Sequence, residues 1–83
     1  MIDLSAVPKT ITNRVESLIG KMESLTDTEI RAEFLNILES DETYASKETI
    51  KKWKGEMSRR KGKLAVMQMI TNLYLAGCNL SLS

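Results

Sequence analysis

Apolar residues recur in steps of three and four along most of this chain, the spacing that places side chains on one face of an α-helix. Near the N-terminus, Pro8 suits the first turn of a helix, because the N–H that proline lacks would have no partner there. The apolar run that follows predicts a first helix over roughly Pro8 to Ser24. Its members are Ile11, Val15, Leu18, Ile19, Met22 and Leu25.

A second helix is predicted to start at Asp27. Thr26, followed three residues later by Glu29, has the pattern of a capping box, in which each residue satisfies a backbone N–H of the other. The residues of the predicted apolar face are Ile30, Phe34, Ile37 and Leu38. Turn-forming Ser, Asp and Thr end this helix near Glu39. We therefore expect two short antiparallel helices joined by a tight turn.

The C-terminal half of the chain, from Ser46 to Asn79, predicts the longest element. Ser46 suits the N-cap of a helix, and Gly77 suits a helix stop in the left-handed conformation. Apolar residues recur between them at Ile50, Trp53, Met57, Leu64, Met67, Ile70, Leu73 and Tyr74. The pattern indicates one long helix, or two collinear helices hinged near Gly62.

These elements predict an all-α fold. We expect residues 1–83 to form a single domain, a small helical bundle with a loose N-terminal arm at 1–7 and a loose C-terminal tail at 80–83. A domain of 83 residues buries a smaller share of its surface than a large domain does, so pairing with a second copy would help to stabilise it. Apolar residues surround most of the last helix, which favours a homodimer. The expected interface residues are Leu64, Met67, Ile70, Leu73 and Tyr74.

The net charge of +1 hides two segments of opposite sign. Residues 23–42 hold seven acids and Arg31 as the single base, whereas residues 47–63 hold eight bases and two acids. Lysine and arginine neutralise phosphates, so the second segment is a candidate nucleic-acid contact, with a solvated basic surface as the alternative. The candidate contact residues are Lys51, Lys52, Lys54, Arg59, Arg60, Lys61 and Lys63.

Residues 46–54, SKETIKKWK, resemble the opening of a recognition helix in helix-turn-helix proteins, where a cap is followed by Thr-Ile and then Trp. The resemblance implies a nucleic-acid contact by this helix. The chain departs from that pattern just before it, since residues 39–44 replace the usual short helix and small-residue turn. Trp53 has two interpretations, because it can stack on a base or belong to the apolar face with Ile50 and Met57.

Composition narrows the possible chemistry. The chain has no histidine and one cysteine, Cys78, which excludes an intramolecular disulfide, a Cys/His zinc cluster and a Ser/His or Cys/His catalytic pair. We expect no cofactor, no metal and no enzymatic activity. Residues 64–83 carry no charge, but Gln68, Thr71 and Asn72 make a membrane span unfavourable. The first residues lack a signal-peptide pattern, so we expect a cytoplasmic protein.

The sequence thus predicts a small, non-enzymatic binding or regulatory protein of the inhibitor or adaptor type. We expect it to act through helical protein–protein contacts, with itself and with a protein partner. One alternative is a nucleic-acid-binding protein that uses the basic segment 47–63. Another is sequestration of a small anionic ligand at a protomer interface lined by Tyr44 or Trp53.

Overall fold

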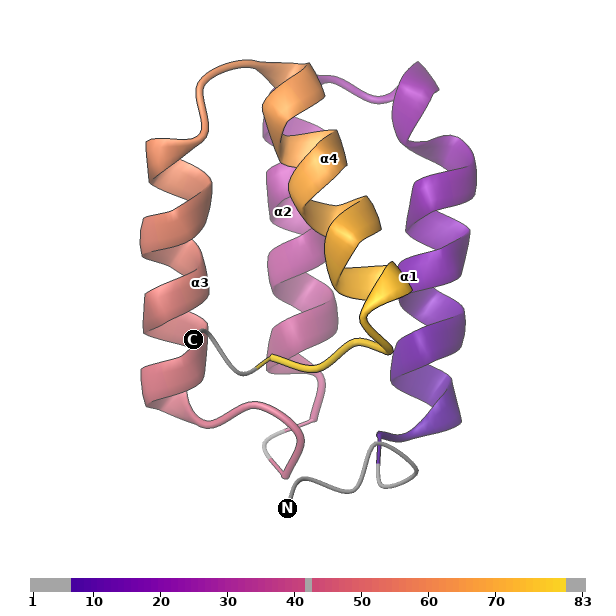
Figure 1. The fold of residues 1–83 in the computed structure, drawn as a ribbon, viewed down its shortest axis with the longest axis vertical. Helices are drawn as coiled ribbons and strands as arrows, with labels where there is room; N and C mark the ends of the chain where they lie inside the picture. The colour runs from indigo at the N-terminus through magenta and orange to yellow at the C-terminus, as the bar shows by residue number, and fades with distance from the viewer. Residues whose placement is uncertain (1–6, 42, 81–83) are drawn as a thin grey trace.

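The computed structural model describes residues 7–41 and 43–80, and over these residues the protein consists of helices without strands. The helices are α1 (Lys9–Lys21), extended by a short 3₁₀ turn η2 (Met22–Ser24), then α2 (Asp27–Glu39), α3 (Lys47–Arg59) and α4 (Lys63–Leu75). Successive helices run in opposite directions, and α4 lies in front of α1 and α2 in Figure 1. The predicted all-α class is confirmed.

The first two helices lie where the sequence predicts them. Pro8 takes the N-cap position of α1, and Thr26 takes that of α2. The Thr26 hydroxyl accepts a hydrogen bond from the Glu29 N–H at 3.1 Å, and the Glu29 carboxylate accepts one from the Thr26 N–H at 2.9 Å. The bond from the Thr26 backbone lowers the pKa of Glu29. The predicted capping box is therefore present.

The predicted long C-terminal helix is wrong. Helix α3 ends at Arg59, and Gly62 adopts φ +90°, a conformation in which a Cβ atom would be strained. The chain reverses there, so α4 runs antiparallel to α3 rather than collinear with it (Figure 1). The position of the break near Gly62 was predictable, but its direction was not, because a glycine marks a flexible point without specifying where the chain goes.

Arg31 of α2 holds this turn in place. Its guanidinium donates hydrogen bonds to the carbonyl of Met57 and, at 2.6 Å, to the carbonyl of Arg60. It also pairs with Asp27 one helical turn earlier, at 2.5 Å. Carbonyls at the C-terminal end of a helix lack the usual partner within the helix, and Arg31 satisfies the Arg60 carbonyl in this way. It also adds a second hydrogen bond to the Met57 carbonyl, which accepts from the Arg60 N–H at 3.1 Å. A side chain from α2 thereby fixes where α3 ends.

The end of α4 is a glycine stop, as predicted. Gly77 has φ +73°, the Gly77 N–H donates to the Tyr74 carbonyl, and the Cys78 N–H donates to the Leu73 carbonyl. These two bonds form a Schellman motif. The chain then packs across the bundle, since the Trp53 indole N–H donates to the Leu80 carbonyl at 3.2 Å.

Only parts of the predicted arm and tail can be compared with the structure. Val7 and Leu80 are partly buried against the core. Residues 1–6 and 81–83, the rest of the predicted loose arm and tail, lie outside the described residues.

Helix α2 packs against all three other helices and carries the centre of the core. Phe34 and Ile30 have no exposed surface, and the Phe34 ring meets the edge of Trp53 at a centroid distance of 5.9 Å and an angle of 74°. The inner sides of α1 and α4 complete this core with Val15 and Ile70. The apolar periodicity of the sequence therefore marks the inner sides of four helices in one chain.

Candidate binding surfaces

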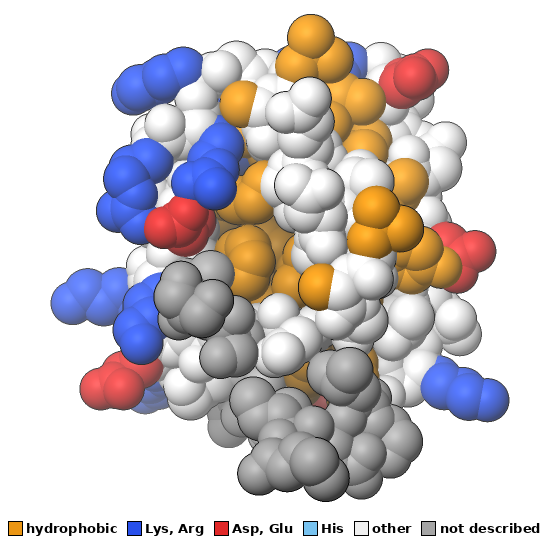
Figure 2. Space-filling model, viewed as in Figure 1, with side chains coloured by type: hydrophobic (Ala, Val, Ile, Leu, Met, Phe, Trp, Pro, Cys, Tyr) orange, Lys and Arg blue, Asp and Glu red, His pale blue; other side chains and the backbone are white. Residues whose placement is uncertain are grey.

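The outer side of α4 carries no charged residue. Leu64 and Leu75 are 74% and 76% exposed, and they are the large hydrophobic residues most exposed to solvent in the described chain. Gln68 and Thr71 lie between them on the same line, because steps of four, three and four residues return to one side of a helix. The centre of Figure 2, where α4 lies, is uncharged, and lysine, arginine and acidic side chains stand at its margins. We call Leu64, Gln68, Thr71 and Leu75 the α4 face.

Of the five predicted interface residues, only Leu64 belongs to this face. Ile70 and Leu73 are 0% and 4% exposed because they pack into the core of their own chain, whereas Met67 and Tyr74 are half-buried and Leu64 is exposed. The reason is geometric. Three successive steps of three residues, from Leu64 to Leu73, turn the side chain by about 180° at 100° per residue. The sequence analysis missed Leu75, which the spacing of eleven residues from Leu64 would have identified.

A shallow hollow of mixed character borders the α4 face. It has a volume of about 230 Å³ and lies between α3 and α4. Its apolar lining residues are Trp53, Met69, Leu73 and Ala76, and its polar or charged ones are Glu56, Arg60, Asn72 and Asn79. Hydrophobic side chains are visible in Figure 2 in this gap. The uncharged surface of α4 therefore ends at this hollow, where the charged Glu56 and Arg60 lie.

The seven predicted basic contact residues do not form one uniform patch. Lys51, Lys52 and Lys61 are exposed and make no ion pair with a described residue. The other four have partners within the chain. Lys54 pairs with Glu39 at 4.0 Å, Arg59 and Arg60 pair with Glu56, and Lys63 donates to the Glu23 carbonyl at 2.5 Å.

Most of the acidic side chains are engaged inside the protein. Glu33 pairs with Lys21 at 3.6 Å, and Glu16 accepts a hydrogen bond from the Tyr74 hydroxyl at 2.9 Å. Hydrogen bonding from Arg59, with further attraction from Arg60, lowers the pKa of Glu56. Asp27, Glu29, Glu39 and Asp41 also have partners. The basic side chains without a described partner are Lys47, Lys51 and Lys52 on α3, where Glu48 is also without one, and Lys9, Arg14 and Lys61 elsewhere.

The aromatic side chains near α3 are not available to a base or a ligand. Trp53 is 5% exposed and belongs to the core, as one of the two interpretations of its spacing predicted. The Tyr44 hydroxyl donates to the Cys78 carbonyl, and burial raises its pKa well above the ordinary range. The resemblance to a recognition helix also has no counterpart in the arrangement, since α2 and α3 form an antiparallel pair (Figure 1).

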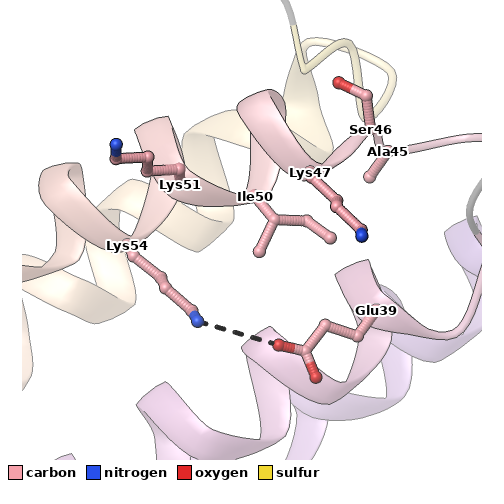
Figure 3. Close-up of a pocket in the computed structure, with 7 residues that line it drawn as sticks. All are labelled: Glu39, Ala45, Ser46, Lys47, Ile50, Lys51 and Lys54. Atoms are coloured by element: carbon pink, nitrogen blue, oxygen red, sulfur yellow. Dashed lines mark ion pairs between the residues drawn. The ribbon is translucent and has the colours of Figure 1, made fainter.

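A larger groove lies between the end of α2 and the first two turns of α3. Its volume is about 690 Å³, and Figure 3 shows the residues that line it. The amines of Lys47 and Lys54 extend into the space on either side of Ile50, and Glu39 of α2 stands opposite. Lys51, Ala45 and Ser46 complete the lining. We call this the α2–α3 groove; sequence analysis anticipated Lys51 and Lys54 but not Lys47, Ile50 or Glu39.

Other kinds of site find little support in the described residues. Residues 7–41 and 43–80 contain no group of three or more cysteine or acidic side chains placed to hold a metal ion. Burial raises the pKa of the Cys78 thiol, which disfavours the reactive thiolate. None of the helices described is both long and apolar enough to cross a membrane.

Comparison with protein-family models, with curated proteins and with solved structures found no match for this chain.

Proposed function

We propose that this chain is a non-enzymatic binding protein of the inhibitor or adaptor type, which pairs with a second copy through α4 and offers its other helices to a protein partner. The observation that carries this proposal is the uncharged α4 face with its two exposed leucines. A helix side that faces water usually carries charged residues, whereas α4 has none after Lys63.

A second copy fits this face because the face is self-complementary. In an antiparallel pair of α4 helices related by a two-fold axis, Leu64 of each copy meets Leu75 of the other. The same symmetry brings Gln68 opposite Thr71, where an amide and a hydroxyl can hydrogen-bond. Such isologous contacts, in which each residue is used twice, are the commonest basis of protein dimers.

The dimer would arrange the remaining surfaces for a partner. Both leucines belong to α4, so α3 of each copy would stay outside the α4–α4 contact with its unpaired lysines exposed. A protein with two such surfaces and little catalytic chemistry is suited to occupying or bridging other proteins. This is the reason for the inhibitor or adaptor assignment.

Sedimentation of the wild-type chain and of a Leu64→Glu/Leu75→Glu variant tests the proposal. We expect a dimer in the wild type and at least tenfold weaker association in the variant, because four glutamates would meet in the apolar contact. The matched control is Thr28→Glu/Ser58→Glu, which adds the same charge at exposed positions of α2 and α3. A monomer in the wild type at every concentration, or equal dissociation of the control, would contradict the α4 contact.

Nucleic-acid binding is the second candidate, favoured by the unpaired lysines of α3. Lys51 and Lys52 have no described ion-pair partner, while most acids are occupied within the chain. Without an available aromatic side chain, the contact would rest on phosphates alone and would be insensitive to base sequence. Affinity for a DNA duplex should then fall steeply with added salt and fall further in Lys51→Glu/Lys52→Glu. No binding at low salt would remove this candidate.

A further inference from the structure

We propose that the α2–α3 groove binds an acidic peptide segment of a partner protein, with one apolar side chain of the segment lying against Ile50. The inference goes beyond the α4 contact and does not depend on it, because the groove lies on α2 and α3.

The charge of the groove specifies an anionic occupant. Three lysines, Lys47, Lys51 and Lys54, line it against the single carboxylate of Glu39. Lys47 and Lys51 make no ion pair with a described residue, and Lys54 is at the outer limit of pairing with Glu39, at 4.0 Å. The groove therefore has an uncompensated positive charge that a partner's carboxylates can neutralise.

The arrangement of these charges favours a peptide over a compact anion. Lys47 and Lys54 are seven residues apart on α3, a separation of about 10 Å along the helix axis. Their amines extend on either side of Ile50 (Figure 3). An ion bound at one of these amines would lie on one side of Ile50, whereas two acidic side chains of one segment can pair with an amine on each side.

The centre of the groove distinguishes a peptide from a nucleic acid. Ile50 is only partly buried, and it presents an apolar surface between the lysines. A phosphate backbone would bury this surface against charged oxygens, without a favourable contact. A segment with acids on both sides of a leucine, isoleucine or valine matches the charges and covers Ile50, which adds hydrophobic stabilisation.

Selection from a phage-displayed random peptide library tests the inference. We expect the enriched peptides to carry Asp or Glu on both sides of an apolar residue. A synthetic copy of the most enriched peptide should bind Lys47→Glu/Lys54→Glu at least tenfold more weakly than the wild type. The matched control Lys52→Glu/Lys61→Glu changes the net charge equally at exposed positions outside the groove, and it should bind nearly as the wild type does.

Two further variants separate a specific site from general attraction. Ile50→Ser leaves every charge in place and should weaken the selected peptide severalfold. Exchanging one acidic residue of that peptide for lysine should restore part of its binding to the single variant Lys47→Glu or Lys54→Glu. Circular dichroism of each variant checks that the helices are retained.

The inference is overturned if no acidic peptides are enriched, or if the control variant loses binding as the groove variant does. It is also overturned if a single-stranded oligonucleotide binds the wild type more tightly than the peptide and displaces it, which would assign the groove to nucleic acid. Peptide binding is measured in Leu64→Glu/Leu75→Glu as well. Retention there separates this site from the proposed α4 contact, so either can fail alone.

Discussion

Helices α3 and α4 have the same length, lie next to each other in the sequence and pack one side each into the same core, yet their outer sides differ in kind. The outer side of α3 carries lysines, several of them unpaired. The outer side of α4 carries two exposed leucines and uncharged polar residues. Both helices thus turn an apolar side inward, but only α3 carries charged residues on its outer side, whereas α4 is apolar on more than its inner side.

In a small helical bundle, this difference teaches that the outer-side residues are the ones to examine for a binding surface. Inner residues such as Trp53 and Ile70 are set by packing and would be apolar whatever the protein does. Outer residues are free to be charged, so the uncharged outer side of α4 is the basis of the proposed contact with a second copy. The unpaired lysines of α3 are the basis of the proposed anionic partner.

The largest expected effects come from the inner sides, where the two helices should behave alike. Trp53→Ala on α3 should lower the free energy of unfolding by about 3–5 kcal/mol, and Ile70→Ala on α4 by about 2–5 kcal/mol, because each leaves a cavity in the core. Urea denaturation measures both. A small loss of unfolding free energy at either position would contradict the expectation that the inner sides of α3 and α4 contribute alike to stability.

Substitution at the turn between α3 and α4 should give the next largest effect on the free energy of unfolding. Arg31→Met removes the donors to the carbonyls of Met57 and Arg60 and should cost about 1–3 kcal/mol, since the Arg60 carbonyl loses its side-chain partner and the Met57 carbonyl keeps only its backbone one. Arg14→Met on α1 is the matched control, because Arg14 is exposed and has no described partner. Equal stability of the two variants in urea would mean that Arg31 does not hold the turn.

Alanine substitutions at Gly62 and Gly55 should have opposite effects on stability, because Gly62 lies in the turn and Gly55 lies inside α3. Gly62→Ala places a Cβ atom at φ +90° and should destabilise the protein by about 1 kcal/mol or more. Gly55→Ala lies inside α3, where its Cβ would be 3.6 Å from an Arg59 nitrogen, an ordinary contact. It should stabilise the protein by about 0.4–1 kcal/mol. Thermal unfolding of both variants checks the opposite signs.

The smallest expected effect is a pH dependence in the acid range, from a carboxylate that α3 has and α4 lacks. Hydrogen bonds from Arg59 and Arg60 lower the pKa of Glu56 below 4.5, so its contribution to stability is present above that pH and is lost as pH falls through the lowered pKa. Glu56→Gln should therefore be less stable than the wild type at pH 7, with the difference shrinking at pH 3. A difference that is the same at both pH values would contradict this. No residue of α4 is acidic, so α4 makes no such contribution.

Features that depend on neighbours in sequence were predictable. The capping box of Thr26 and Glu29 and the stop at Gly77 each involve residues a few positions apart, so the local pattern determines them. The reversal at Gly62 was not, because it depends on Arg31, which is 29 residues from Arg60. The same limit applies to the α2–α3 groove, where Glu39 and Lys54 come from different helices.

The orientation of α4 was missed for another reason. Its sequence is apolar at so many positions that several helical faces fit the pattern equally well. Only the positions of α1 and α2 decide that Ile70 and Leu73 turn inward and that Leu64 and Leu75 turn outward.

The most direct test of the α4 contact is disulfide formation between two single-cysteine variants, Leu64→Cys and Leu75→Cys, oxidised separately and as an equal mixture. Cys78 is buried and should not compete. An antiparallel α4 pair places position 64 of one copy beside position 75 of the other, so the mixture should give a rapid 64–75 cross-link while each variant alone reacts slowly. Fast cross-linking of Leu64→Cys with itself, or no preference for the mixture, would contradict the antiparallel contact.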